Sequence, residues 1–161
     1  MGAADQRHFD RLRQAHFPPE RNHLPAHLTL FHQLPPSSRD ELDALIRSIA
    51  ADTPPPAAMV RDIYSLGRGV AFRIESPDLL AVRARIAGRF HGLLTAQDRG
   101  TPRLHITIQN KAVPGEARAL RDALAGGFRP RALTITGLAA HLYRGGPWEL
   151  LFKRNFRGPR T

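Results

Sequence analysis

The chain contains no cysteine, and this absence excludes several classes of chemistry. Without thiols there is no disulfide framework, no thiol nucleophile and no zinc site built on thiolates. Long apolar runs are also lacking. No stretch approaches the roughly 18 residues of a membrane helix, and residues 1–13 lack the apolar core of a signal peptide. We therefore expect a cytoplasmic protein with no membrane partner.

Lysine is scarce, but positive charge is not. All of the 24 basic residues except Lys111 and Lys153 are arginine, and with 14 acidic residues the formal net charge is +10. This balance favours a polyanionic partner, such as nucleic acid or a phosphate ester. The 161 residues, 42% of them hydrophobic, suffice for one compact domain with its own core.

The spacing of apolar residues and of glycine and proline predicts a chain that mixes helices and strands. Apolar residues at helical spacing predict helices over 5–16, from a start at 37–41 through Ile49, over 77–91 and over 116–125. Ser38 and Glu41 have the spacing of a capping box. Residues that favour β-structure predict strands over 26–31, 58–66, 69–75, 104–109, 132–143 and 148–154. Residues 67–69 and 144–147 are expected as hairpin turns, and residues 157–161 as a frayed tail.

The second half of the chain repeats the first at a shift of 78 residues. The shift carries His27 onto His105, Thr29 onto Thr107, Leu42 onto Leu120 and Gly67 onto Gly145. We therefore predict a bilobal α+β fold with a pseudo-twofold axis, in which two mainly antiparallel sheets flank a central cleft and helices lie outside. The repeat units are expected at residues 1–75 and 76–154, within one domain that ends in a basic tail at 155–161.

The same register leaves the strand at 69–75 without a counterpart, because its equivalent would lie before Met1. We therefore expect a sheet edge in the first lobe that is either unpaired or filled by a partner.

Two tetrapeptides carry the expected chemistry: His27-Leu28-Thr29-Leu30 and His105-Ile106-Thr107-Ile108. On a strand, residues i and i+2 share a face, so each His and Thr would point to one side while the aliphatic residues enter the core. The chain's 8 histidines and 8 threonines would give about 0.4 His-x-Thr triplets by chance. Two copies in the same register of a repeat therefore point to a shared function.

Paired imidazoles and hydroxyls suit the cleavage of a phosphodiester. A neutral histidine can take a proton from the nucleophile, and a protonated one can give a proton to the leaving oxygen. Threonine hydroxyls can donate hydrogen bonds to the phosphate oxygens. This chemistry requires no metal and no cofactor, and it predicts a bell-shaped dependence of rate on pH.

The paired His-x-Thr-x motifs resemble those of the 2H phosphoesterase superfamily, and in particular its 2′-5′ RNA ligase-like (RNA 2′,3′-cyclic phosphodiesterase) branch, over about residues 8–154. The resemblance implies that His27 and His105 are the acid/base pair and that Thr29 and Thr107 bind the phosphate. It also implies that nucleoside 2′,3′-cyclic phosphates are opened to 2′-phosphates. Some members of the family also join RNA ends reversibly through a 2′-5′ linkage. We expect a monomer whose substrate is RNA or another nucleotide phosphodiester.

Strand parity adds further candidates for substrate binding. Phe31 would share the face of His27 and could stack on a base, or it could belong to the core. Arg103, Gln109 and Lys111 would share the face of His105, and their cations would hold phosphates or be solvated. Three further residues lie beside the hairpin turns, where they could reach the cleft: Arg68, Tyr143 and Arg144.

Two other functions stay open at this point. One is a phosphodiesterase for a small cyclic nucleotide-type substrate. The other is a module that binds RNA or a nucleotide without turnover, although binding alone does not require an acid/base pair.

Overall fold

The computed structural model describes residues 1–145 and 147–159. The expected α+β class is confirmed, because helices and antiparallel strands are both present throughout. The chain forms two compact units that are interleaved along the sequence. Unit 1 comprises residues 1–29, 58–75 and 103–133, and unit 2 comprises 30–57, 76–102 and the described part of 134–161.

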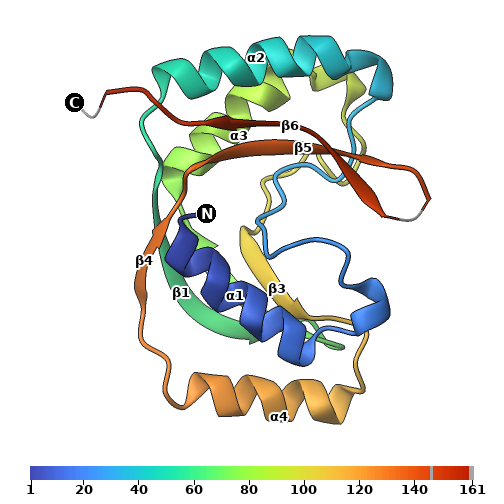
Figure 1. The fold of residues 1–161 in the computed structure, drawn as a ribbon, viewed down its shortest axis with the longest axis vertical. Helices are drawn as coiled ribbons and strands as arrows, with labels where there is room; N and C mark the ends of the chain where they lie inside the picture. The colour runs from blue at the N-terminus through green and yellow to red at the C-terminus, as the bar shows by residue number, and fades with distance from the viewer. Residues whose placement is uncertain (146, 160–161) are drawn as a thin grey trace. The chain divides into compact units, whose positions relative to one another are not determined.

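Unit 1 is built on a four-stranded sheet in the order β3-β2-β1-β4, in which β1 and β3 both pair antiparallel with β2. Its strands are β1 (Ala57–Ser65), β2 (Val70–Glu75), β3 (His105–Gln109) and β4 (Arg131–Thr134). Helix α1 (Ala3–His16) packs against β3 (Figure 1). Helix α4 (Pro114–Ala125) contacts β2. Aromatic rings from α1 and from the loop after α4 both contact Phe72 of β2. The ring centre of Phe72 lies 5.2 Å from that of Phe9 and 5.9 Å from that of Phe128.

Two glycines shape the hairpin between β1 and β2, at the turn expected from the sequence. Gly67 has φ +81°, a left-handed conformation that glycine adopts without steric cost. Gly69 lies so close to β3 that an added Cβ would be 2.1 Å from the carbonyl oxygen of Gln109. Glycine at this position therefore lets β2 and the end of β3 pack together.

Unit 2 contains α2 (Arg39–Asp52), α3 (Pro77–Arg89) and the hairpin of β5 (Gly137–Tyr143) and β6 (Trp148–Asn155). Helix α2 packs along this hairpin (Figure 1). Its buried Ile46 and Ile49 supply apolar core to the unit, as do Leu138 and Phe152 of the hairpin. The turn expected at 144–147 includes residue 146, which lies outside the described residues. The described residues also form three short 3₁₀ helices: η1 (Pro19–Arg21), η2 (Pro36–Ser38) and η3 (His91–Leu93).

Four local predictions are wrong. The single strand expected over 132–143 is two strands, β4 and β5, which belong to different sheets. Residues 26–31 do not form a strand. Ser38 precedes α2, but its side chain does not cap the helix. The tail is not frayed at its start, because the Arg157 and Gly158 N–H groups donate to backbone carbonyls near the end of α2, at 2.8 and 2.9 Å. The expected tail residues 160–161 lie outside the described residues.

The structural units do not coincide with the repeat in the sequence. Strand β3 comes from the second repeat, yet it pairs with β2 from the first. The pairing of strands from both repeats does not test where each sequence repeat begins and ends, so the repeat boundaries stay a prediction. None of the described helices has the length and apolar character that crossing a membrane requires.

Candidate active site

The second motif lies on β3, and its side chains alternate as expected. Ile106 and Ile108 are fully buried, whereas His105 and Thr107 are half-buried. In the register with β2, His105 lies opposite Arg73 and Thr107 lies opposite Ala71. Because residues two apart on a strand share a face, the histidine and the threonine lie on one side of the sheet.

The first motif has no strand to hold it, and helix α1 binds the residue before it instead. The Ala26 N–H donates to Asp10 Oδ1 at 2.6 Å, and the Ala26 carbonyl accepts from Gln6 Nε2 at 2.9 Å. Gln6 Nε2 also donates to the Asp10 carboxylate at 3.0 Å. Gln6 and Asp10 are one turn apart and therefore share a face of the helix. Together they fix both polar backbone groups of the residue next to His27.

The same face of α1 also holds the second motif, through Arg13. This arginine is 5% exposed, and its Nη1 donates to the carbonyl of Thr107 at 2.8 Å. Since β3 is an edge strand, its outward carbonyls need partners other than a strand. Arg13 Nε donates to Asn22 Oδ1 at 3.1 Å, and its guanidinium lies 4.1 Å from the centre of the Phe17 ring. Burial lowers the pKa of Arg13, and the Asp10 charge opposes this shift.

The two motif histidines have the same orienting hydrogen bond. His27 Nδ1 lies 2.7 Å from the carbonyl oxygen of Pro25, and His105 Nδ1 lies 2.7 Å from that of Arg103. A carbonyl can only accept, which assigns a proton to Nδ1 in both rings. Proton exchange with a substrate is thereby left to Nε2 of each imidazole. The two histidines therefore have the same tautomer, and each is held by a backbone carbonyl two residues earlier.

Tyr64 of β1 lies next to His105 and was not found from the sequence. The two rings meet edge to face, with centres 6.2 Å apart. The Arg73 guanidinium lies 5.3 Å from the Tyr64 ring centre and donates to Asp62 at 3.1 Å. Burial raises the pKa of Tyr64, although the charges of Arg73 and Arg103 oppose this shift, so the phenol is neutral near pH 7. Tyr64 pairs with Ala71 of β2, and Ala71 pairs with Thr107 of β3. The position of Tyr64 beside the second motif therefore depends on the register of three strands, which the sequence alone does not give.

A family model described as the 2′-5′ RNA ligase superfamily matches residues 2–147. The chain belongs to this superfamily. The resemblance of the chain to the 2H phosphoesterase superfamily is thereby confirmed. Among solved structures, the chain is similar to TT0787 of Thermus thermophilus, with a TM-score of 0.64 and 18% identity. The match covers 99% of this chain and 96% of TT0787, and it shows a shared fold. No curated protein matches the chain.

Not all of the further residues predicted for this 2′-5′ RNA ligase superfamily member lie on the face of His105. Arg103 is exposed just before β3 and supplies the carbonyl that holds the ring. A bulge places Gln109 opposite Val70, so it shares the face of Phe72; it is 7% exposed, and its Oε1 has no hydrogen-bond partner in the described part of the chain. Lys111 is exposed beyond the end of β3, with φ 57°. The parity argument therefore holds through Ile108 and fails from Gln109 onward.

Phe31 lies in unit 2, where it packs against a buried arginine. The Arg83 guanidinium is 4.7 Å from the Phe31 ring centre, and its Nε donates to the carbonyl of Leu30 at 3.0 Å. The buried Asp98 accepts from the N–H groups of His32 and Gln33, at 3.0 and 3.1 Å. Side chains thus bind the backbone after the first motif as well as before it.

The residues beside the hairpin turns have local partners. Arg68 donates to the carbonyl of Ala112 at 3.3 Å, Arg144 pairs with Glu149 at 2.9 Å, and the Tyr143 ring centre lies 4.8 Å from that of Trp148. Among residues 1–145 and 147–159, no group of three His, Asp or Glu side chains is placed to hold a metal ion.

Proposed function

We propose that this member of the 2′-5′ RNA ligase superfamily is a phosphodiesterase that opens RNA 2′,3′-cyclic phosphate ends to 2′-phosphates without a metal. The observation that carries the proposal is the matched hydrogen bonding of His27 and His105, each with Nδ1 2.7 Å from a carbonyl two residues earlier. One of the two Nε2 atoms can then act as a base and the other as an acid. Membership in the superfamily supports phosphodiester chemistry.

The proposed reaction is a single displacement at phosphorus. The neutral histidine takes a proton from water through Nε2, and the water oxygen bonds to phosphorus. The bond from phosphorus to O3′ breaks, and the protonated histidine gives its Nε2 proton to O3′. The Thr29 and Thr107 hydroxyls donate to the phosphate oxygens as their charge grows. The product carries a 2′-phosphate and a free 3′-hydroxyl.

The same groups would also serve an RNA 5′-hydroxyl in place of water. That hydroxyl would lose its proton to the basic histidine and bond to phosphorus, while O3′ leaves as before. The product of this second reaction is a 2′-5′ linkage, so one assay can follow both reactions.

The test uses purified protein in EDTA with the four nucleoside 2′,3′-cyclic phosphates and with an oligoribonucleotide that ends in a cyclic phosphate. Products are separated as 2′-phosphates, 3′-phosphates and joined RNA. We expect 2′-phosphates, and a fall in kcat of at least ~10² for either His27→Ala or His105→Ala. The control is His91→Ala, which removes an exposed histidine of unit 2 that lies outside both motifs.

Three results would contradict the proposal. Binding of the substrates without turnover would make the chain a nucleotide-binding module. A 3′-phosphate product would mean that O2′ leaves phosphorus and not O3′. Unchanged turnover by the double histidine variant would remove the acid and the base from the mechanism.

A further inference from the structure

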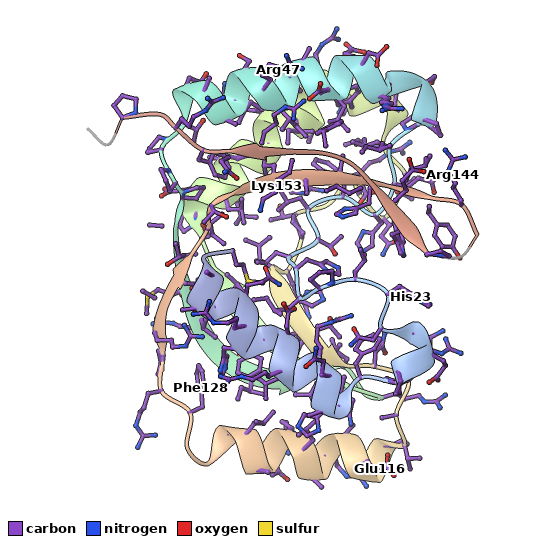
Figure 2. The ribbon with its side chains drawn as sticks, viewed as in Figure 1. His23, Arg47, Glu116, Phe128, Arg144 and Lys153 are labelled. Atoms are coloured by element: carbon purple, nitrogen blue, oxygen red, sulfur yellow. The ribbon has the colours of Figure 1, made fainter. Side chains whose placement is uncertain are left out.

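A pocket of about 410 Å³ concentrates positive charge in unit 2, whereas both His-x-Thr motifs belong to unit 1. All of the side chains that line it are polar, and four are cationic: Arg47, Lys153, Arg154, Asn155 and Arg157. Figure 2 shows Arg47 on α2 and Lys153 on the hairpin that packs along this helix. The pocket is therefore formed where α2 meets the end of β6.

One carboxylate holds two of the arginines in place. Asp43 Oδ2 accepts from Arg47 Nη2, and Asp43 Oδ1 pairs with Arg154 Nη2, both at 2.7 Å. A guanidinium carries five N–H donors, so each arginine retains donors for a ligand after this contact. The single carboxylate orders the pair but cannot neutralise the four cations around the pocket.

The other two cations have no ion pair in the part of the chain that the structure describes: Lys153 and Arg157 are exposed and unneutralised. The backbone of Arg157 is nevertheless fixed, since its N–H donates to the Ala50 carbonyl at 2.8 Å. The next residue, Gly158, packs so closely that an added Cβ would lie 2.5 Å from the backbone of Asp52. The end of α2 thus anchors Arg157 at the pocket, and its side chain is left for a ligand.

We propose that this pocket binds the phosphodiester backbone of single-stranded RNA. Guanidinium groups match phosphate oxygens in geometry as well as in charge. The lining offers no apolar side chain that could insert into a lipid bilayer, which disfavours a membrane surface as the partner. The choice of RNA rests on the proposed function, whereas the preference for phosphate follows from the pocket itself.

The experiment measures binding of a labelled oligoribonucleotide of about 12 nucleotides by fluorescence anisotropy over a range of salt concentrations. The RNA ends in a 3′-hydroxyl and cannot be turned over, so a failure of the proposed catalysis would leave this measurement unaffected. The test variant carries Lys153→Gln and Arg157→Gln. The matched control carries Arg118→Gln and Arg129→Gln, which remove two exposed cations of unit 1.

If both pocket cations contact phosphates, the test variant loses two contacts. The slope of log K against log salt concentration should then become shallower by about 1.4, since each contact with a single strand contributes about 0.7. We expect the affinity to fall at least ~10-fold for the test variant and less than ~2-fold for the control. Thermal denaturation verifies that both variants are folded.

Other outcomes would overturn the proposal. Equal losses in the two variants would mean that RNA binds through diffuse charge. Competition by inorganic phosphate that matches RNA at equal phosphate concentration would indicate a site for the free ion. Loss of binding to phosphatidylserine vesicles, with RNA binding unchanged, would indicate a membrane contact.

Discussion

Replacing Arg13 by methionine would test whether α1 holds the second motif in place. The substitution keeps an unbranched stem and removes the guanidinium. Three contacts disappear: the hydrogen bonds to the Thr107 carbonyl and to Asn22 Oδ1, at 2.8 and 3.1 Å, and the stacking on Phe17 at 4.1 Å. The Thr107 carbonyl would then lack its partner at the edge of the sheet.

The net loss can be estimated from these contacts. Hydrogen bonds to a charged group contribute roughly 1.5–3 kcal/mol each, and the cation–π contact contributes about 0.5–2 kcal/mol. The variant also avoids the desolvation of a buried cation, the same effect that lowers the pKa of Arg13. We therefore expect the free energy of unfolding to fall by about 2–3 kcal/mol, which lowers the Tm by roughly 4–12 °C in a chain of this length.

The assay pairs thermal denaturation with kcat and KM for a nucleoside 2′,3′-cyclic phosphate at a temperature where all variants are folded. Arg11→Met is the matched control, because Arg11 is exposed on the same helix. We expect kcat to fall for Arg13→Met with an unchanged pH optimum, since both histidines remain, and Arg13→Lys to restore part of the loss by keeping one donor. Equal Tm and kcat for the Arg13 and Arg11 variants would refute the role given to this guanidinium.

The sequence predicted β3 and failed for residues 26–31, although both have the same alternation of polar and aliphatic residues. Alternation of polar and aliphatic residues indicates that a segment has one buried and one exposed side. A β-strand also requires a neighbouring strand with which it can form hydrogen bonds. β3 has β2 beside it, at a register of Thr107 opposite Ala71. The backbone around the first motif is bound by side chains of residues distant in sequence, such as Asp10 and Arg83. No local pattern identifies such partners.

The supporting residues were harder to find than the motifs, for physical reasons. Gln6, Asp10 and Arg13 form a polar stripe on α1, and such a stripe ordinarily faces solvent. Their spacing was visible in the sequence, but their burial depends on which segments pack beside the helix. The prediction for Gln109 is wrong for another reason. A β-bulge moves the residues that follow it to the opposite face of the sheet, and no residue pattern in the sequence indicates the bulge.

Two further predictions concern packing and pH. Gly69→Ala should lower the free energy of unfolding by about 2–4 kcal/mol, because the new Cβ would meet the Gln109 carbonyl oxygen at 2.1 Å; the control Gly88→Ala, in open space on α3, should be neutral or slightly stabilising in the same urea denaturation. For Asp98, burial alone would raise the pKa, but the hydrogen bonds from His32 and Gln33 outweigh it and lower the pKa below its ordinary value. The ionised carboxylate therefore stabilises the fold above about pH 4, and this contribution is lost as the pH falls through the lowered pKa. Asp98→Asn should cost about 1–3 kcal/mol at pH 7, and its deficit relative to the unchanged protein should shrink towards pH 3. Urea denaturation at pH 7, 5 and 3 measures this difference. A deficit that stays constant over that range would mean that Asp98 acts through its shape and hydrogen bonds and not through its charge.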